Sequence, residues 1–107
     1  MGIFMRILGN VHDMSLETVR AEISKVDTEI IRLIAQRQQL AEKVARIKIA
    51  NGRPIHDQPQ TAKVLEWVFE QAVESRIDPV AVQKIFEMLI AMSEERQREC
   101  SGDGNLT

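Results

Sequence analysis

The chain has 107 residues, of which 44% are hydrophobic and 28% are charged, and its formal net charge is −2. This length predicts a single domain, and the composition excludes a disordered or fibrous protein. Basic and acidic residues are mixed along the sequence and leave no basic face for a phosphate backbone, so nucleic acid is not an expected partner.

Residues 1–14 are predicted to form a tail or a short packed arm. Their apolar cluster is shorter than the core of a signal peptide, and no run in the chain approaches the ~18 apolar residues of a membrane span. The alternative is that these residues are a remnant of an upstream start. The folded domain is expected to cover residues 15–100.

The first predicted helix is long, starting near Ser15 and covering about 36 residues. Asn51 and Gly52 can adopt the left-handed conformation that ends a helix, and Pro54 prevents its continuation. Such a helix is about 54 Å long, more than the diameter of a compact domain of this size. Its apolar positions, called the apolar seam below, recur at spacings of three and four: Leu16, Val19, Ile23, Val26, Ile30, Leu33, Leu40, Val44 and Ile47.

Two shorter helices follow. One is expected to begin after Asp57 as N-cap, with Pro59 in its first turn, and the other after Asp78, with Pro79 at the first helical position. Residues 101–107 are predicted to be a disordered tail. Because no alternating strand pattern is present, the predicted fold is all-α, with one long N-terminal helix and two shorter helices.

The two shorter helices can cover only part of the apolar seam. Packing the remainder against the same helix of a second chain predicts an intertwined helical homodimer. An ordinary coiled-coil dimer explains the seam equally well, but it does not explain why Arg37 stands in the seam between Leu33 and Leu40.

A charged side chain in an apolar seam loses hydration and needs a partner. Lys48 lies eleven residues after Arg37, so the two cations share one face of the helix, within ~20° and about 16 Å apart along its axis. The space between them suits a small organic anion. Lys48 taken alone has a simpler explanation, a solvated lysine that interacts favourably with the C-terminal end of the helix dipole.

The last helix shows a similar interruption. Its apolar stripe through Val82, Phe86 and Leu89 continues at the same spacing to Ser93 and Gln97. Each is equally well explained as a polar residue where the helix leaves the core. Together with Arg37, they predict a shared pocket with cations and hydrogen-bond donors and no obvious acid–base pair or nucleophile.

Arg20 points about 100° away from the face of Arg37 and Lys48. It could not easily reach the pocket of its own chain. In a two-fold dimer, the Arg20 of the partner could do so, which predicts a site composed of two chains.

The chain resembles the all-helical chorismate mutases. The similarity rests on "VRAEISKVDTEIIRLIAQRQQLAEKVARIK", "NGRPIHD", "IDP" and "KIFEMLIAMSEERQ", and it covers about residues 15–100. In that family, three helices per chain form an interlocked dimer with two active sites. The resemblance implies a cofactor-free isomerase that converts chorismate to prephenate in aromatic amino acid biosynthesis.

The resemblance also implies roles for individual residues. The partner's Arg20 and the chain's own Arg37 would bind the substrate carboxylates, while Lys48 and Gln97 would donate hydrogen bonds to the ether oxygen. Ser93 would make a secondary contact. Asp57 would bind the ring hydroxyl, or it would act only as an N-cap.

One segment departs from the family pattern. Where the family commonly has Arg-Glu, this chain has Gln60 and Thr61, so a cation near a carboxylate and an acceptor for the ring hydroxyl are replaced. Thr61 is still expected to line the substrate site. Arg53 or Lys63, which are close in sequence, are candidates for the missing positive charge.

The altered segment leaves other functions open. On the same fold, the chain could be an isochorismate-pyruvate lyase or an aminodeoxychorismate mutase. A non-catalytic helical dimer module is a further alternative, although polar residues retained in a seam lower stability unless they are used.

Neither a disulfide nor a metal site is expected. Cys100 is the only cysteine, and His12 and His56 have no second ligand at a useful spacing. A single cysteine fits the reducing cytoplasm, which is the expected location.

Overall fold

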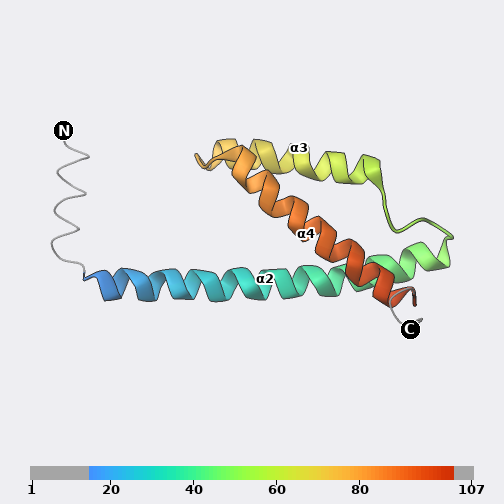
Figure 1. The fold of residues 1–107 in the computed structure, drawn as a ribbon, viewed down its shortest axis with the longest axis horizontal. Coiled ribbons are helices and arrows are strands. Elements are labelled where there is room, and N and C mark those ends of the chain that lie inside the picture. The colour runs from blue at the N-terminus through green and yellow to red at the C-terminus, as the bar shows by residue number, and fades with distance from the viewer. Residues whose placement is uncertain (1–14, 103–107) are drawn as a thin grey trace. The chain divides into compact units, whose positions relative to one another are not determined.

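The computed structural model describes residues 15–102, and in this range all regular structure is helical. The helices are α2 (Leu16–Ala50), α3 (Gln58–Glu74) and α4 (Pro79–Cys100), shown in Figure 1. The predicted all-α fold with one long and two shorter helices is confirmed. The predicted N-terminal arm and residues 103–107 of the predicted tail lie outside the described range.

The ends of α2 follow from local hydrogen bonds. At its start, the Ser15 hydroxyl accepts from the amide of Thr18 at 3.1 Å. At its end, the amide of Arg53 donates to the carbonyl of Lys48 at 2.8 Å, across Gly52 with its φ of +63°. Gly52 therefore takes the left-handed conformation that closes the helix. Asn51 does not, and its side chain instead donates to the carbonyl of Ile47 at 2.8 Å.

The starts of the two shorter helices are capped as predicted. The carboxylate of Asp57 accepts from the amide of Gln60 at 3.1 Å. The carboxylate of Asp78 accepts from the amide of Val80 at 3.0 Å. A proline occupies the first turn of each helix, where its missing amide hydrogen has no cost.

The chain divides into two compact units, residues 1–33 and residues 34–107, with the boundary inside α2. The described part of the first unit is a single stretch of helix, residues 15–33, in which no residue is buried. Most of its seam residues are strongly exposed, from 60% for Leu16 to 49% for Ile30, and Val19 is partly exposed. The single chain therefore provides no core for this half of the seam.

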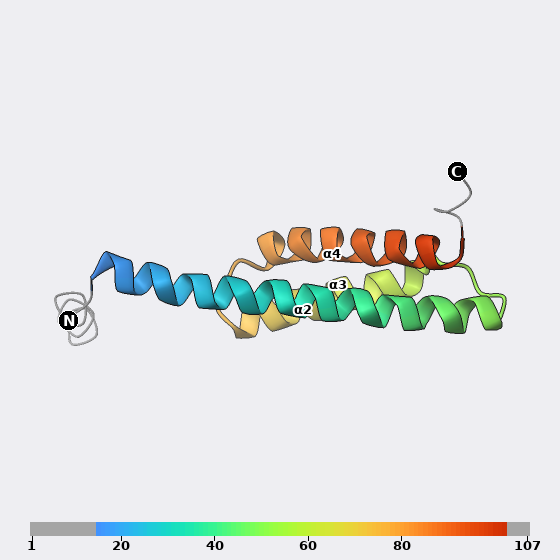
Figure 2. The same ribbon diagram turned by 90° about the horizontal axis from the view of Figure 1, so that it is seen from below.

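The second unit combines the remainder of α2 with α3 and α4. α3 and α4 pack against each other, and α4 then runs away from α3 toward the C-terminal end of α2 (Figures 1 and 2). The buried apolar residues are few and small: Ala41, Ala45, Val68 and Ala72. The larger seam residues Leu40 and Ile47 remain 49% and 58% exposed, so this core is small even for the unit that contains it.

No described helix combines the length and apolar character that are required to cross a bilayer.

Candidate active site

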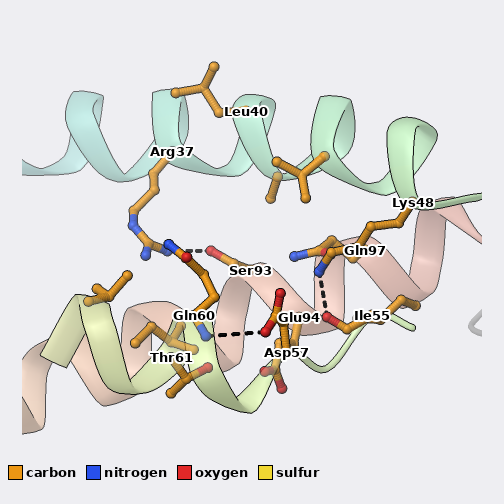
Figure 3. A pocket seen from close by; sticks show the side chains of 14 residues that line it. Arg37, Leu40, Lys48, Ile55, Asp57, Gln60, Thr61, Ser93, Glu94 and Gln97 are labelled. Atoms are coloured by element: carbon orange, nitrogen blue, oxygen red, sulfur yellow. Dashed lines mark hydrogen bonds between the residues drawn. The ribbon is translucent and has the colours of Figure 1, made fainter. Parts of the chain in front are cut away.

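The second unit contains a cavity of about 470 Å³ between α2, the loop before α3, α3 and α4 (Figure 3). This volume lies within the usual range for small-molecule sites. Six residues predicted from the sequence line it: Arg37, Lys48, Asp57, Thr61, Ser93 and Gln97. The cavity therefore brings together side chains that are up to sixty positions apart in the chain.

Arg37 reaches from α2 toward α4. Its Nη1 donates to the carbonyl of Leu89 at 2.9 Å and to the hydroxyl of Ser93. The same hydroxyl donates its own hydrogen to the Leu89 carbonyl at 3.1 Å. These contacts orient the guanidinium, and burial lowers the pKa of Arg37 from its usual value. Within residues 15–102 no carboxylate forms an ion pair with it, so its charge is available to an anionic ligand.

Lys48 makes the corresponding contact near the end of α2. Its Nζ donates to Oε1 of Gln97 at 2.8 Å and to the carbonyl of Ile55. Gln97 is buried, with 6% of its surface exposed. Because the lysine uses the amide oxygen, the amide nitrogen of Gln97 is available as a second donor beside the ammonium group. No carboxylate from the described part of the chain forms an ion pair with Lys48.

The opposite wall of the cavity is the first turn of α3. Asp57 lines the cavity and also caps the helix through Oδ1. Gln60 and Thr61 line it as well. The two residues that depart from the family pattern thus face the same space as Arg37 and Lys48, where an altered side chain contacts any ligand directly.

Sequence reasoning did not identify Glu94, an acidic residue in the cavity wall. The sequence did contain an indication of this position. Glu94 precedes Gln97 by three residues, a spacing that places two side chains on one helix face. The predicted pocket of cations and donors was therefore incomplete. Glu94 also binds His56, with 2.8 Å between Oε1 and Nδ1, and this hydrogen bond and the carboxylate charge raise the pKa of His56 above 6.5.

The remaining candidate residues lie elsewhere. Arg20 is exposed in the first unit and does not line the cavity of the second. Arg53 lines a smaller cavity of about 290 Å³ together with Lys48 and Asp57. Lys63 lines neither of these cavities. Of the two candidates for an additional cation, Arg53 is thus the one beside residues of the site.

The site has a definite chemical character. Two cations that form no ion pair with a described carboxylate, a hydroxyl and an amide donor converge on one cavity of small-molecule size. The fold and this cavity describe a helical protein whose site suits a small organic anion. No cluster of three or more potential metal-ligating side chains occurs within the described range.

Comparisons with known proteins agree with this class. Residues 19–98 match the family Chorismate mutase type II. The chain is 32% identical to the chorismate mutase of Methanocaldococcus jannaschii over 84 residues, which are 78% of this chain and 85% of that protein. The chain therefore belongs to the chorismate mutase type II family.

Longer relatives carry a second activity. The chain is 32% identical over 78 residues to a bifunctional chorismate mutase/prephenate dehydratase of Enterobacter agglomerans, covering 73% of this chain and 20% of that protein. A bifunctional enzyme of the same name from Buchnera aphidicola is 28% identical over 85 residues, which are 79% of this chain and 22% of that protein. The chain thus spans about a fifth of the length of these bifunctional relatives.

Proposed function

We propose that this chain catalyses the rearrangement of chorismate to prephenate, a step of aromatic amino acid biosynthesis. The family and the similarity to the archaeal chorismate mutase support this function. The main structural support is that Arg37 and Lys48 line one cavity and are oriented by hydrogen bonds to α4. Neither forms an ion pair with a carboxylate of the described residues.

The reaction breaks a C–O bond while a C–C bond forms, and no proton has to move. Catalysis then requires that the dianion is held in its compact reactive conformation and that charge growing on the ether oxygen is stabilised. Arg37 can bind a carboxylate through its planar fork. Lys48 and the free amide nitrogen of Gln97 are donors for the ether oxygen. Ser93 orients Arg37, and Asp57 and Thr61 contact the ring from the α3 side.

We further propose that two chains form a homodimer through the apolar seam. The large apolar residues of α2 are exposed in the single chain, including Ile23 at 53% and Val26 at 58%. A continuous exposed apolar surface of this kind is typical of a protein interface. A second copy presents the same seam, and pairing the two seams buries both.

In this dimer, the partner's Arg20 would complete the cavity by binding the second carboxylate of the substrate. The proposal is testable by mixing two inactive variants, Arg20→Ala and Lys48→Ala. If Arg20 acts across the interface, one site of each mixed dimer contains neither substitution. Random assortment then restores activity in about a quarter of all sites.

The matched control mixes Arg37→Ala with Lys48→Ala, two residues of the same cavity in one chain. No mixed dimer of these variants has an intact site, so no activity should return. Failure of the Arg20→Ala and Lys48→Ala mixture to recover activity, with mixed dimers demonstrated by mass spectrometry, would refute the composite site.

The substrate is tested by incubating the purified protein separately with chorismate, isochorismate and aminodeoxychorismate, and by identifying the products by chromatography. Prephenate from chorismate at enzymatic rates is expected. Pyruvate and salicylate from isochorismate alone would identify a lyase. Turnover of the amino compound alone would identify a mutase for that substrate, and no product from any of the three would favour a non-catalytic module.

We place the protein in the cytoplasm. The support is the single exposed Cys100, which is compatible with a reducing compartment.

A further inference from the structure

Glu94 lies in the wall of the cavity that holds the two cations. Its side chain is only 18% exposed. It lies three residues before Gln97 on one helix face and lines the same cavity as Ser93, and these two residues of α4 contact Lys48 and Arg37. A carboxylate in a site for an anion weakens binding by repulsion unless it is neutralised or used.

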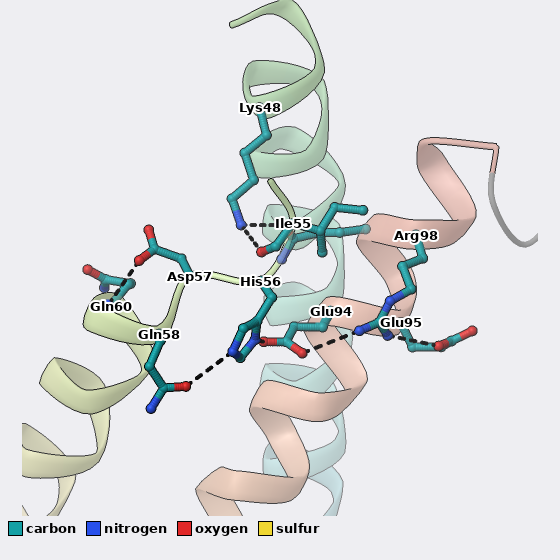
Figure 4. A network of polar contacts seen from close by, with 10 residues as sticks. Lys48, Ile55, His56, Asp57, Gln58, Gln60, Glu94, Glu95 and Arg98 are labelled. Carbon is teal, nitrogen blue, oxygen red and sulfur yellow. Dashed lines mark hydrogen bonds and ion pairs between the residues drawn. The ribbon is translucent and has the colours of Figure 1, made fainter. Parts of the chain in front are cut away.

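In the structure Glu94 pairs with His56 and Arg98 rather than with the two cations. Its Oε1 lies 2.8 Å from Nδ1 of His56, and its Oε2 lies 3.6 Å from Nη2 of Arg98 (Figure 4). The other ring nitrogen of His56 lies 3.1 Å from Oε1 of Gln58. Both ring nitrogens thus face oxygen atoms, as a protonated imidazole requires. The charge of Glu94 is therefore compensated by His56 and Arg98, and no carboxylate within residues 15–102 forms an ion pair with Arg37 or Lys48.

The first turn of α3 provides little acidic capacity for a ligand, which makes the carboxylate of Glu94 important in this cavity. Gln60 and Thr61 carry no charge, and one oxygen of Asp57 already accepts the capping hydrogen bond. Each carboxylate oxygen has two acceptor positions, so the contacts to His56 and Arg98 leave Glu94 with capacity for a ligand. It is the acidic group that α4 contributes to the described cavity wall.

We propose that Glu94, held by His56 and Arg98, accepts a hydrogen bond from a donor group on the ring of the substrate and so determines substrate specificity. A hydroxyl and an ammonium group share the required chemistry. This inference rests on the proposed function, because it concerns the ring of a chorismate-like substrate whose carboxylates would bind Arg37 and the partner's Arg20.

The test compares Glu94→Gln with wild type on three compounds: chorismate, its amino-substituted analogue and an analogue without the ring substituent. Glu95→Gln is the matched control, because Glu95 is the neighbouring acid, also contacts Arg98 at 3.3 Å and does not line the cavity. Steady-state kinetics give kcat and KM, and competition against chorismate gives the affinity of any compound that is not turned over.

We expect Glu94→Gln to weaken binding of the compounds that carry a donor by about tenfold, because a charged hydrogen-bond acceptor is replaced by a neutral one. Binding of the analogue without the donor should be unchanged or stronger. Glu95→Gln should change none of the three. The donor compound with the larger loss identifies whether a hydroxyl or an ammonium group is the intended partner.

Equal weakening of all three compounds would overturn the inference, because it would indicate a general disturbance of the site. An unchanged affinity of Glu94→Gln for both donor compounds would also overturn it. Failure of the proposed function is recognised separately, since wild type itself would then not convert chorismate. In that case calorimetric titration of wild type and Glu94→Gln with the three compounds still tests whether Glu94 binds the ring substituent.

Discussion

The two walls of the cavity differ in how they relate to the helices that carry them. On the wall formed by α2 and α4, Arg37, Ser93 and Gln97 occupy positions where packing alone would favour apolar residues. On the wall formed by α3, Asp57, Gln60 and Thr61 occupy a first helical turn, where polar residues are ordinary. A functional residue on the wall of α2 and α4 can thus be recognised in the sequence, whereas one on the wall of α3 resembles an ordinary residue of a helix start.

This difference separates two questions about the site. In the proposed mechanism, the wall of α2 and α4 supplies the positive charge that the rearrangement needs. The wall of α3 carries Gln60 and Thr61, where the chain departs from the expected family pattern, so we propose that substrate choice depends on this wall and on Glu94. Substitutions on the two walls should therefore differ in their effects, the largest being expected on the wall of α2 and α4.

The largest effect is expected for Lys48→Ala. Loss of one donor to the charge that grows on the ether oxygen should lower kcat by about 10² to 10³-fold. Lys43→Ala is the matched control, because Lys43 is exposed on the same helix and does not line the cavity. Near-normal turnover of the folded Lys48→Ala protein would remove this lysine from the mechanism, and with it the special role of the α2 and α4 wall.

A smaller effect is expected for Ser93→Ala. The hydroxyl accepts from Arg37 and orients its guanidinium, and a single hydrogen bond of this kind contributes about 1 kcal/mol, or roughly five- to tenfold in kcat/KM. Ser101→Ala, which removes a hydroxyl from the capping position of the same helix, is a control for general effects on α4. If Ser93→Ala has full activity, Arg37 does not need this contact for its orientation.

Asp57 is tested by comparing Asn with Ala. Asparagine caps a helix as well as aspartate, whereas alanine costs about 1 kcal/mol of stability. If Asp57 binds substrate, Asp57→Asn should retain wild-type thermal stability and show a KM raised severalfold. If Asp57 is only a cap, Asp57→Asn should match wild type in both measurements and only Asp57→Ala should be less stable.

The smallest effect concerns pH. The hydrogen bond and charge of Glu94 raise the pKa of His56 above its ordinary value of 6.5. A group whose pKa is higher in the folded state contributes stability that is complete below about pH 6.5 and is lost as the pH rises through the folded pKa. His56→Gln should therefore lower the midpoint of thermal unfolding more at about pH 5.5 than at about pH 8.5. An equal difference at both pH values would contradict a charged pair.

Much of the fold was determined by local sequence. The spacing of the apolar seam predicted α2, and Asp57 and Asp78 predicted the starts of α3 and α4, because capping and amphipathic periodicity act between residues within a few positions. Arg37 and Gln97 were recognisable for the same reason. Each interrupts a local pattern whose continuation would be apolar, and in the structure both residues line one cavity together with Lys48 and Ser93.

Other features depended on the tertiary structure. Glu94 and His56 are separated by 38 positions and meet only because α4 approaches the loop before α3. Likewise, only the three-dimensional arrangement left Lys63 outside both cavities, whereas Arg53 lies near Lys48 through the local turn that ends α2. The sequence by itself determined where helices begin, which faces are apolar and which charges interrupt them. Tertiary packing decided which charges meet, because long-range contacts depend on how helices approach one another.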